Sequence, residues 1–232
     1  MKKTISLSAF LLLAVWASAQ ISFNAAYASL NASEWEKVAG DLYPQNGYKL
    51  GLDYWFKLKK KRIEFTPEIT LASFSQSSSQ GSIDRELQAR FIGFHFNTSV
   101  YPMDLGNDCN CPTFKKDGSI IEKGFFIQVS PGLDVFRGRY TDSVQDADID
   151  AEDTVFNLGL GVGLDIGLLP IVTLTPFASY RYYFETNWEG LGSQLSTTDP
   201  SPNDIADNPN QFYIGLKLGF RFDELRNYGW RR

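Results

Sequence analysis

The stretch Gln211-Phe-Tyr-Ile-Gly-Leu-Lys-Leu-Gly-Phe-Arg-Phe222 decides the fold of this chain. Every second residue from Phe212 to Phe222 is large and apolar. The residues between them are Tyr213, Gly215, Lys217, Gly219 and Arg221. Because a strand points successive side chains to opposite faces, this segment has one apolar face and one small or charged face. Its length is enough to cross a bilayer at a tilt, so the pattern indicates a membrane-crossing strand whose second face lines a narrow polar lumen.

The start of the chain has the organisation of a secretory signal peptide. Two lysines are followed by a mostly apolar run that is too short for a membrane helix, and small residues then lead up to Ala19. We therefore expect cleavage between Ala19 and Gln20. The expected domains are a signal peptide at residues 1–19, a β-barrel at residues 20–222 and a short periplasmic tail at residues 223–232.

The composition of the mature chain excludes several classes of protein. Without the two lysines of the leader, 20 basic residues stand against 27 acidic ones, a net charge of -7, which argues against nucleic acid as a partner. No later segment has the roughly 18 apolar residues of a spanning helix, so the chain can enter a membrane only as a closed barrel. Aromatic residues make up 15% of the sequence, which suits the aromatic girdles of membrane barrels.

Seven further segments show alternation similar to that of the opening stretch, which predicts eight strands in one domain. The expected strands are residues 21–30, 48–56, 62–74, 86–101, 125–137, 155–167, 171–184 and 211–222. Long polar loops are expected at residues 31–47, 75–85, 138–154 and 185–211, with tight turns at residues 57–61 and 168–170. With the N-terminus in the periplasm, the long loops lie outside the cell, as in outer-membrane barrels. The connection at residues 102–124 is the exception to this alternation.

Two irregularities and one rival fold follow from the same pattern. The alternation changes phase near Phe91 and Ile92, which we interpret as a β-bulge. Proline cannot donate a hydrogen bond to a sheet, so Pro67, Pro131 and Pro176 predict local bulges or unpaired positions. The rival fold is a soluble lipocalin-like barrel, which would place the apolar face inside and the glycines and charges outside.

The chain resembles the small eight-stranded outer-membrane barrels of the OmpA/OmpX-like kind, and especially the outer-membrane β-barrel domain proteins of Bacteroidota. The specific motif is their C-terminal assembly signal, which is matched by Tyr213, Gly215, Leu218 and Phe220, with Phe222 following. The resemblance implies an all-β, antiparallel, up-and-down transmembrane barrel, integral to the outer membrane and in contact with its lipid. It also implies recognition by the barrel-assembly machinery. In this chain ten residues follow the motif, whereas in the family the chain ends on the aromatic residue.

The positions expected to face the lumen carry as many acids as bases. An eight-stranded barrel is just wide enough to be filled by side chains, so these charges are expected to pair and to plug the lumen. The alternative is a narrow path for ions or small solutes. The expected members of this charge network are Lys49, Asp53, Glu64, Glu68, Arg90, Asp134, Asp165, Arg181, Lys217 and Arg221.

Neither a metal site nor a catalytic site is expected. Asp146, Asp148 and Asp150 alternate as calcium ligands can, but they are weak candidates because Ala151 replaces the glycine of an EF-hand loop. His95 is the only histidine, and no nucleophile motif surrounds it, so we expect a structural residue facing the lumen. We therefore expect no cofactor, no metal and no enzymatic activity.

The connection at residues 102–124 carries the two cysteines. Cys109 and Cys111 are expected to form a local disulfide in the oxidising periplasm. A connection of this length is more apt than a turn to contact a protein partner. The leading hypothesis is a structural or surface-interaction barrel that acts through its external loops. One alternative is an accessory subunit of an envelope secretion or barrel-assembly machine that uses residues 102–124, and another is a narrow small-solute channel.

Overall fold

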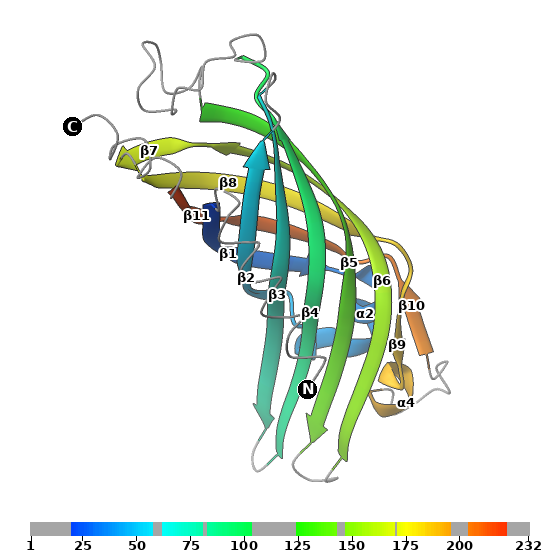
Figure 1. Cartoon of the computed structure of the whole chain (residues 1–232). Coiled ribbons are helices and arrows are strands. Elements are labelled where there is room, and N and C mark those ends of the chain that lie inside the picture. Colours follow the sequence, from blue (N-terminus) through cyan, green and yellow to red (C-terminus); the bar gives the residue numbers. More distant parts are fainter. Residues whose placement is uncertain are drawn as a thin grey trace, which may run out of the picture.

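The computed structural model describes residues 20–57, 62–80, 83–103, 124–142, 147–169, 171–195 and 204–221, most of which lie in strands (Figure 1). The strands are β1 (Gln20–Asn31), β2 (Asn46–Lys57), β3 (Ile63–Gln80), β4 (Ile83–Val100), β5 (Phe125–Asp142), β6 (Ala147–Leu164), β7 (Ile166–Leu169), β8 (Val172–Tyr183), β9 (Thr186–Glu189), β10 (Asp204–Asp207) and β11 (Asn210–Arg221). The helices are α2 (Ser33–Ala39), the 3-10 turn η1 (Gly40–Leu42) and α4 (Leu191–Leu195).

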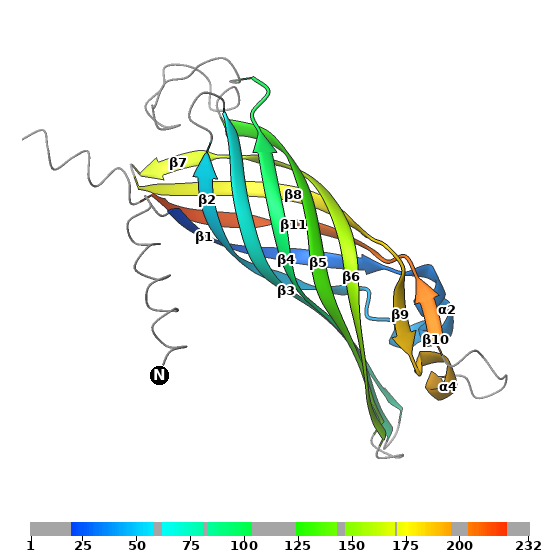
Figure 2. The same cartoon turned by 45° about the vertical axis from the view of Figure 1, so that its right-hand side comes forward.

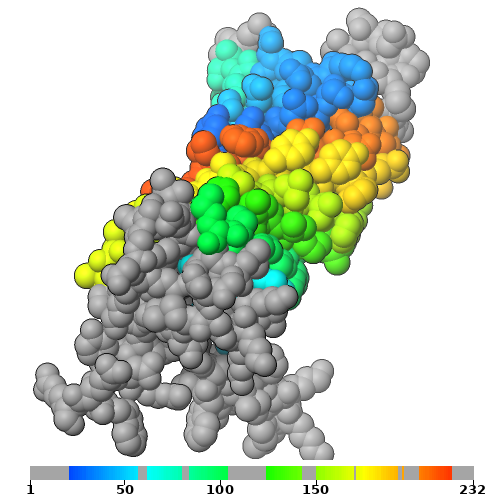
Figure 3. All heavy atoms as spheres, turned by 90° about the horizontal axis from the view of Figure 1, so that it is seen from above, coloured from blue at the N-terminus to red at the C-terminus, as the bar shows by residue number. Residues whose placement is uncertain are grey.

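Eight strands close into one antiparallel barrel, as the sequence predicts. Their order is β1, β2, β3, β4, β5, β6, β8 and β11, and β11 pairs with both β8 and β1. The short strand β7 follows β6 after Asp165 and pairs with β8, as β6 does before it. Seen from above, blue residues near the start of the described chain lie beside orange residues near its end (Figure 3). Each barrel strand therefore has a hydrogen-bonded neighbour on both sides.

The apolar faces of the strands point outward. On β11, Phe212, Ile214 and Leu216 are 46%, 55% and 53% exposed, whereas Tyr213 between them is 2% exposed. The same alternation appears on the other barrel strands, for example at Ile69 of β3, which is 61% exposed. This exposure excludes the lipocalin-like alternative, in which the apolar face would be buried. An apolar exterior around a polar interior is the arrangement of a barrel that spans a membrane.

Two hairpins are longer than the sequence pattern predicts. The pairing of β3 with β4 runs without a break to Gln80 and Ile83, and that of β5 with β6 runs to Asp142 and Ala147. Residues 75–85 and 138–154 are therefore mostly strand rather than loop, and the two ribbons project beyond the other strands (Figure 2). On the β3–β4 ribbon the alternation is hidden because residues 75–79 are all exposed. On the β5–β6 ribbon one face stays buried, at Tyr140 and Ala151 for example, but the large apolar side chains that mark a lipid-facing strand are few there.

The predicted bulge near Phe91 and Ile92 is wrong. The register between β3 and β4 is unbroken, with Phe91 inside at 1% exposure and Ile92 outside at 42%. The sequence changes phase here because the interior itself changes from polar to apolar along the barrel. The prolines interrupt the strand pairing locally, as predicted. Pairing with β2 is missing around Pro67, and pairing with β4 is missing around Pro131. Around Pro176 the pairing of β8 with β6 and β7 is interrupted.

An aromatic core fills the end of the barrel from which the ribbons project. Trp35 of α2 stacks on Phe136 with ring centroids 5.0 Å apart and meets Trp188 of β9 edge-on at 5.1 Å. Phe91 lies 5.1 Å from Phe136 and 4.9 Å from Tyr183. All five rings are at most 2% exposed. We call these five residues the aromatic core.

Two connections that are far apart in the sequence fold together above the aromatic core. The indole of Trp35 donates a hydrogen bond to the carbonyl of Ile205 at 3.1 Å, and the amide of Glu34 donates to the Asp207 carboxylate at 2.7 Å. Strands β9 and β10 pair with each other, so α2, η1, β9, α4 and β10 form a cap at this end of the barrel (Figures 1 and 2). In the described part of the chain, no helix has the length and apolarity needed to cross a bilayer.

The direction of the apolar face can be tested on one strand. Ile69→Arg places a charge in the middle of the outward apolar face of β3 and should lower the free energy of unfolding from lipid vesicles by about 2–4 kcal/mol. Ser77→Arg is the matched control, because Ser77 lies on the same face of β3 but on the projecting ribbon, and it should change stability little. A chain equally stable with either arginine, measured by denaturant titration, would contradict the membrane-spanning arrangement.

Candidate functional site

Two buried ion pairs lie in the middle of the barrel interior. Lys49 of β2 contacts Glu68 of β3 at 2.7 Å, and Lys217 of β11 contacts Asp53 of β2 at 3.1 Å. The amide of Asn24 donates to Glu68 at 2.9 Å and to Asp53 at 3.3 Å, which joins the two pairs. Buried charges are tolerated when they are paired and hydrogen-bonded. Glu68 is bonded through both oxygens, and Asp53 through its Oδ2.

His95 links the ion pairs to the aromatic core. Its Nε2 lies 2.7 Å from Asp134, while its Nδ1 lies 3.9 Å from Glu68 and 3.5 Å from the hydroxyl of Thr70. The hydroxyl of Tyr183, which belongs to the aromatic core, donates to the other oxygen of Asp134 at 2.5 Å. The imidazole thus lies between two carboxylates, at the boundary between the polar and apolar parts of the interior.

Arg181 of β8 completes this network from the opposite wall. Its guanidinium donates to Asn157 and, at 2.9 Å, to the hydroxyl of Ser130. Ser130 donates to Asn97 at 2.5 Å, and Asn97 donates to Glu68 at 2.8 Å. A chain of hydrogen bonds therefore crosses the lumen from β8 to β3.

Inward-facing glycines make room for these charged groups. A Cβ added at Gly93 would lie 1.4 Å from Asp134 Oδ1, and one added at Gly132 would lie 2.2 Å from the ring of His95. Glycine is therefore required at both positions by the close approach of the histidine and the carboxylate. The inward glycines of the sequence therefore leave the space that the side chains of the charge network occupy.

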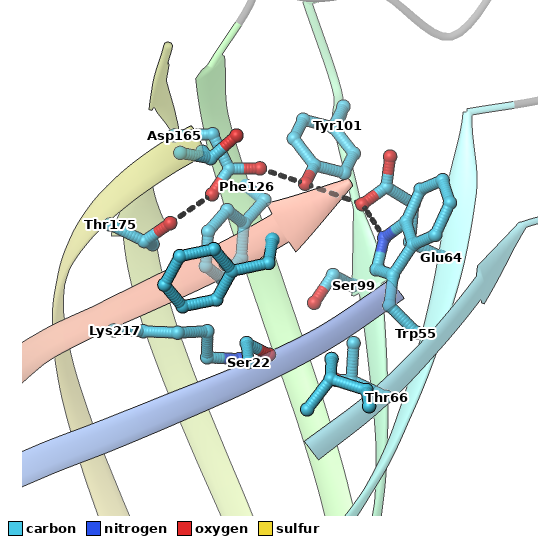
Figure 4. A pocket seen from close by; sticks show the side chains of 14 residues that line it. Ser22, Trp55, Glu64, Thr66, Ser99, Tyr101, Phe126, Asp165, Thr175 and Lys217 are labelled. Carbon is cyan, nitrogen blue, oxygen red and sulfur yellow. Dashed lines mark hydrogen bonds between the residues drawn. The ribbon is translucent and has the colours of Figure 1, made fainter. Parts of the chain in front are cut away.

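A second cluster lies at the end of the barrel where β1 begins. The hydroxyl of Tyr101, just after β4, lies 2.8 Å from Glu64 of β3 and 2.5 Å from Asp165 (Figure 4). The indole of Trp55 donates to Glu64 at 2.5 Å, and the hydroxyl of Thr175 donates to Asp165 at 2.5 Å. Asp165 occupies the break between β6 and β7, where pairing with β8 is interrupted.

The structure places most of the predicted charge network inside the barrel. Arg90 is the exception, and its assignment to the lumen is wrong. It is exposed on the outer face of β4, opposite Arg137 of β5, because the strand has no bulge to turn it inward. Of Arg221 only the backbone is described, and it pairs with Gln20. The interior members are Lys49, Asp53, Glu64, Glu68, Asp134, Asp165, Arg181 and Lys217.

The weak metal candidates do not form a site in the described residues. Asp150 pairs instead with Arg139 at 2.9 Å on the exposed face of the β5–β6 ribbon. The backbone of Asp148 lies opposite Thr141, and Asp146 falls outside the described residues. No group of three or more histidine, cysteine, aspartate or glutamate side chains suited to a metal occurs in the described part of the chain.

Several sequence predictions fall partly or wholly outside the described residues. Ala19, Phe222, Cys109 and Cys111 are among them, so cleavage and the disulfide stay predictions. Within the assembly motif, Tyr213 points inward and Leu218 is exposed at 37%, as alternation requires. Recognition of the motif by an assembly machinery likewise stays a prediction.

Sequence reasoning placed His95 in the lumen but missed its role between two carboxylates. It also missed Tyr101, since an isolated tyrosine at the end of a strand gives no signal of its own. The aromatic core was missed because Trp35 and Trp188 come from expected loops. Only the pairing of strands across the barrel brings these residues together.

Comparisons with known proteins agree on the fold alone. No protein-family model matches the chain, and no curated protein matches it. Neisserial surface protein A is 12% identical with a TM-score of 0.45, covering 88% of this chain and 97% of that one. Ail of Yersinia pestis, in complex with the heparin analogue sucrose octasulfate, is 12% identical with a TM-score of 0.49, covering 88% and 99%. The outer membrane protease OmpT from Escherichia coli is 8% identical with a TM-score of 0.40, covering 88% and 95%.

The chain has the fold of the small eight-stranded outer-membrane barrels. The strand pairing, the closure of β11 on β1 and the outward apolar faces carry this assignment, independently of those distant likenesses. The fold alone does not assign a function to the interior, because one fold serves many functions.

The fit of the interior around His95 can be tested with two glycines. Gly93→Ala should lower the free energy of unfolding by about 1–3 kcal/mol, because its methyl group would displace an Asp134 carboxylate that His95 and Tyr183 hold in place. Gly219→Ala is the control, because its added Cβ would have its closest contact at 3.8 Å. Denaturant unfolding in lipid vesicles measures both, and equal stabilities would show that the interior is not close-packed around His95.

Proposed function

We propose that this chain is a non-enzymatic, integral outer-membrane barrel with a closed lumen, which acts as a structural or surface-interaction protein through its capped end. The observation that carries the proposal is the combination of an outward apolar face with an interior filled by the aromatic core and the ion pairs. The first feature fits a lipid environment, and the second argues against passage of solutes.

Closure of the lumen is supported at two levels. The five rings of the aromatic core pack at centroid distances of 4.9–5.1 Å and leave little room for water. Below them, an ion moving through the barrel would have to separate Lys49 from Glu68 or Lys217 from Asp53. Removing one partner of a buried ion pair costs about 3–5 kcal/mol, so such a path is unfavourable.

The capped end offers a rigid surface for a partner. The β5–β6 ribbon carries Arg137 paired with Glu152 at 3.1 Å and Arg139 paired with Asp150 at 2.9 Å, all of them exposed. Strand pairing continues through the ribbons, so their backbone is ordered before any partner arrives. A pre-organised surface loses less conformational entropy on binding than a flexible loop does.

A catalytic role for His95 is disfavoured by its burial. Thr70, His95 and Asp134 are arranged in the order of a nucleophile, a base and an acid, which invites an enzymatic interpretation. All three are at most 4% exposed, and none lines the pocket around Tyr101 or the interior pocket between Lys49 and Arg181. Neither of these two pockets therefore gives a substrate access to them.

The two alternatives stay predictions. Most of the 102–124 connection lies outside the described residues, so its proposed contact with an envelope machine rests on its length and its cysteines. The channel alternative requires the interior pairs to open.

The closed lumen predicts electrical silence. The purified, folded protein in a planar bilayer should give no steady or stepwise current under conditions in which a porin does. Folding is checked by the shift of the band on heating in gel electrophoresis. A reproducible current from the unmodified chain would overturn the closed lumen and favour the small-solute channel.

The direction of insertion predicts which residues can be labelled from outside the cell. In a background with serine at positions 109 and 111, Ser77→Cys on the β3–β4 ribbon should react with a membrane-impermeant maleimide on intact cells. Met103 lies at the opposite end of the barrel and is 57% exposed. A cysteine introduced by Met103→Cys should react only after the outer membrane is permeabilised. The reverse pattern would place the cap in the periplasm and remove the surface role.

A further inference from the structure

A pocket opens at the end of the barrel opposite the cap, and the proposed surface role makes no use of it. Its walls include Glu64, Tyr101 and Asp165 on one side and Trp55, Thr66 and Phe126 on others (Figure 4). They come from β2, β3 and β5 and from positions directly after β4 and between β6 and β7, so the closed barrel fixes their positions relative to one another. We call this the acidic pocket.

The acidic pocket contains more hydrogen-bond acceptors than donors. The hydroxyl of Tyr101 lies within hydrogen-bonding distance of both Glu64, at 2.8 Å, and Asp165, at 2.5 Å. A phenol has one proton, so it can donate to only one of two ionised carboxylates at a time. Trp55 and Thr175 each supply one further donor, whereas the two carboxylates together offer several more acceptor sites. Within the described part of the chain, the cluster therefore has fewer donors than acceptors.

Among the described residues, the acidic pocket also has few positive charges to set against its carboxylates. Lys217 lines it, but its ammonium group is paired with Asp53 at 3.1 Å. The guanidinium of Arg62 lies over the ring of Tyr101, 4.2 Å from its centroid. Within the described ranges, neither Glu64 nor Asp165 forms an ion pair with a lysine or an arginine. Both carboxylates are at most 9% exposed, where an uncompensated charge is costly.

Thr66 is an independent sign of a missing ligand. It lines the acidic pocket, is 5% exposed, and its hydroxyl has no hydrogen-bond partner among the residues that the structure describes. Most buried hydroxyl groups in proteins are hydrogen-bonded, so an unpartnered one beside a pocket points to a group that the pocket is built to receive.

We propose that the acidic pocket binds a small organic cation that carries a primary ammonium group on an apolar body. The ammonium has three donors and one positive charge, which are the two things that the pocket lacks. It would donate to Glu64 and Asp165, with its third N–H toward a pocket hydroxyl. The apolar body would pack on Phe126 and Trp55, whose rings favour a nearby cation. A calcium ion fits less well, because it takes six to eight oxygen ligands.

The test uses phenethylamine as the probe and 2-phenylethanol as its uncharged match. The full-length mature chain, folded in detergent, is titrated with each compound by calorimetry against a detergent blank. The amine should bind and the alcohol should not. Glu64→Gln and Asp165→Asn should each weaken binding by about tenfold or more, since each removes a charged hydrogen bond. Glu152→Gln, an acid on the outer ribbon, should leave binding unchanged.

Thr66→Val separates binding from folding. It removes an unpartnered hydroxyl, so the barrel should remain folded by its heat-shifted band while the amine binds severalfold more weakly. Several results would overturn the proposal: no heat with the amine, equal binding of the alcohol, binding that survives loss of both carboxylates, or displacement of the amine by calcium at comparable concentration. If the Gln and Asn variants fail to fold, the Thr66→Val result decides alone.

Discussion

The pairing of β11 with β1 is the contact on which the rest of the structure depends. Inside a bilayer no water is present to satisfy backbone amides and carbonyls, so a sheet can cross only if it has no free edge. The ladder from Gln20–Arg221 to Asn31–Asn210 removes the two edges that the chain would otherwise leave. In a closed barrel the number of strands sets how narrow the interior is, and eight strands leave space for side chains only.

A narrow interior explains the unusual residues on the inward faces. Large side chains from eight strands cannot all fit, so glycines at positions such as Gly93 and Gly132 alternate with the charged groups that fill their space. The same restriction divides the lumen into a polar part held by ion pairs and an apolar part held by stacked rings. His95 stands where the two parts meet, which is why its partners include both Asp134 and Glu68.

The sequence predicts the barrel well where one face meets lipid and the other does not. On β11 the contrast between outward Leu216 and inward Lys217 is large, and it predicts both the strand and which of its faces points outward. Prediction fails where the two faces of a strand no longer differ in polarity in the usual way. On the ribbons the outward face is polar, so these strands resemble loops in the sequence. Arg90 is misplaced because apolar Phe91 faces an apolar interior. The donor-poor cluster around Tyr101 depends on pairing between strands, which alternation alone does not contain.

The cap has a consequence for the order in which the chain folds. Its first part lies directly after β1 and its second part just before β11, and Trp35 and Ile205, which it brings together, are 170 residues apart. Contacts of such separation carry a high entropic cost until intervening structure has formed. The β1–β11 ladder joins residues at least as far apart, so the cap and the closure of the barrel are subject to the same entropic cost and are expected to form together.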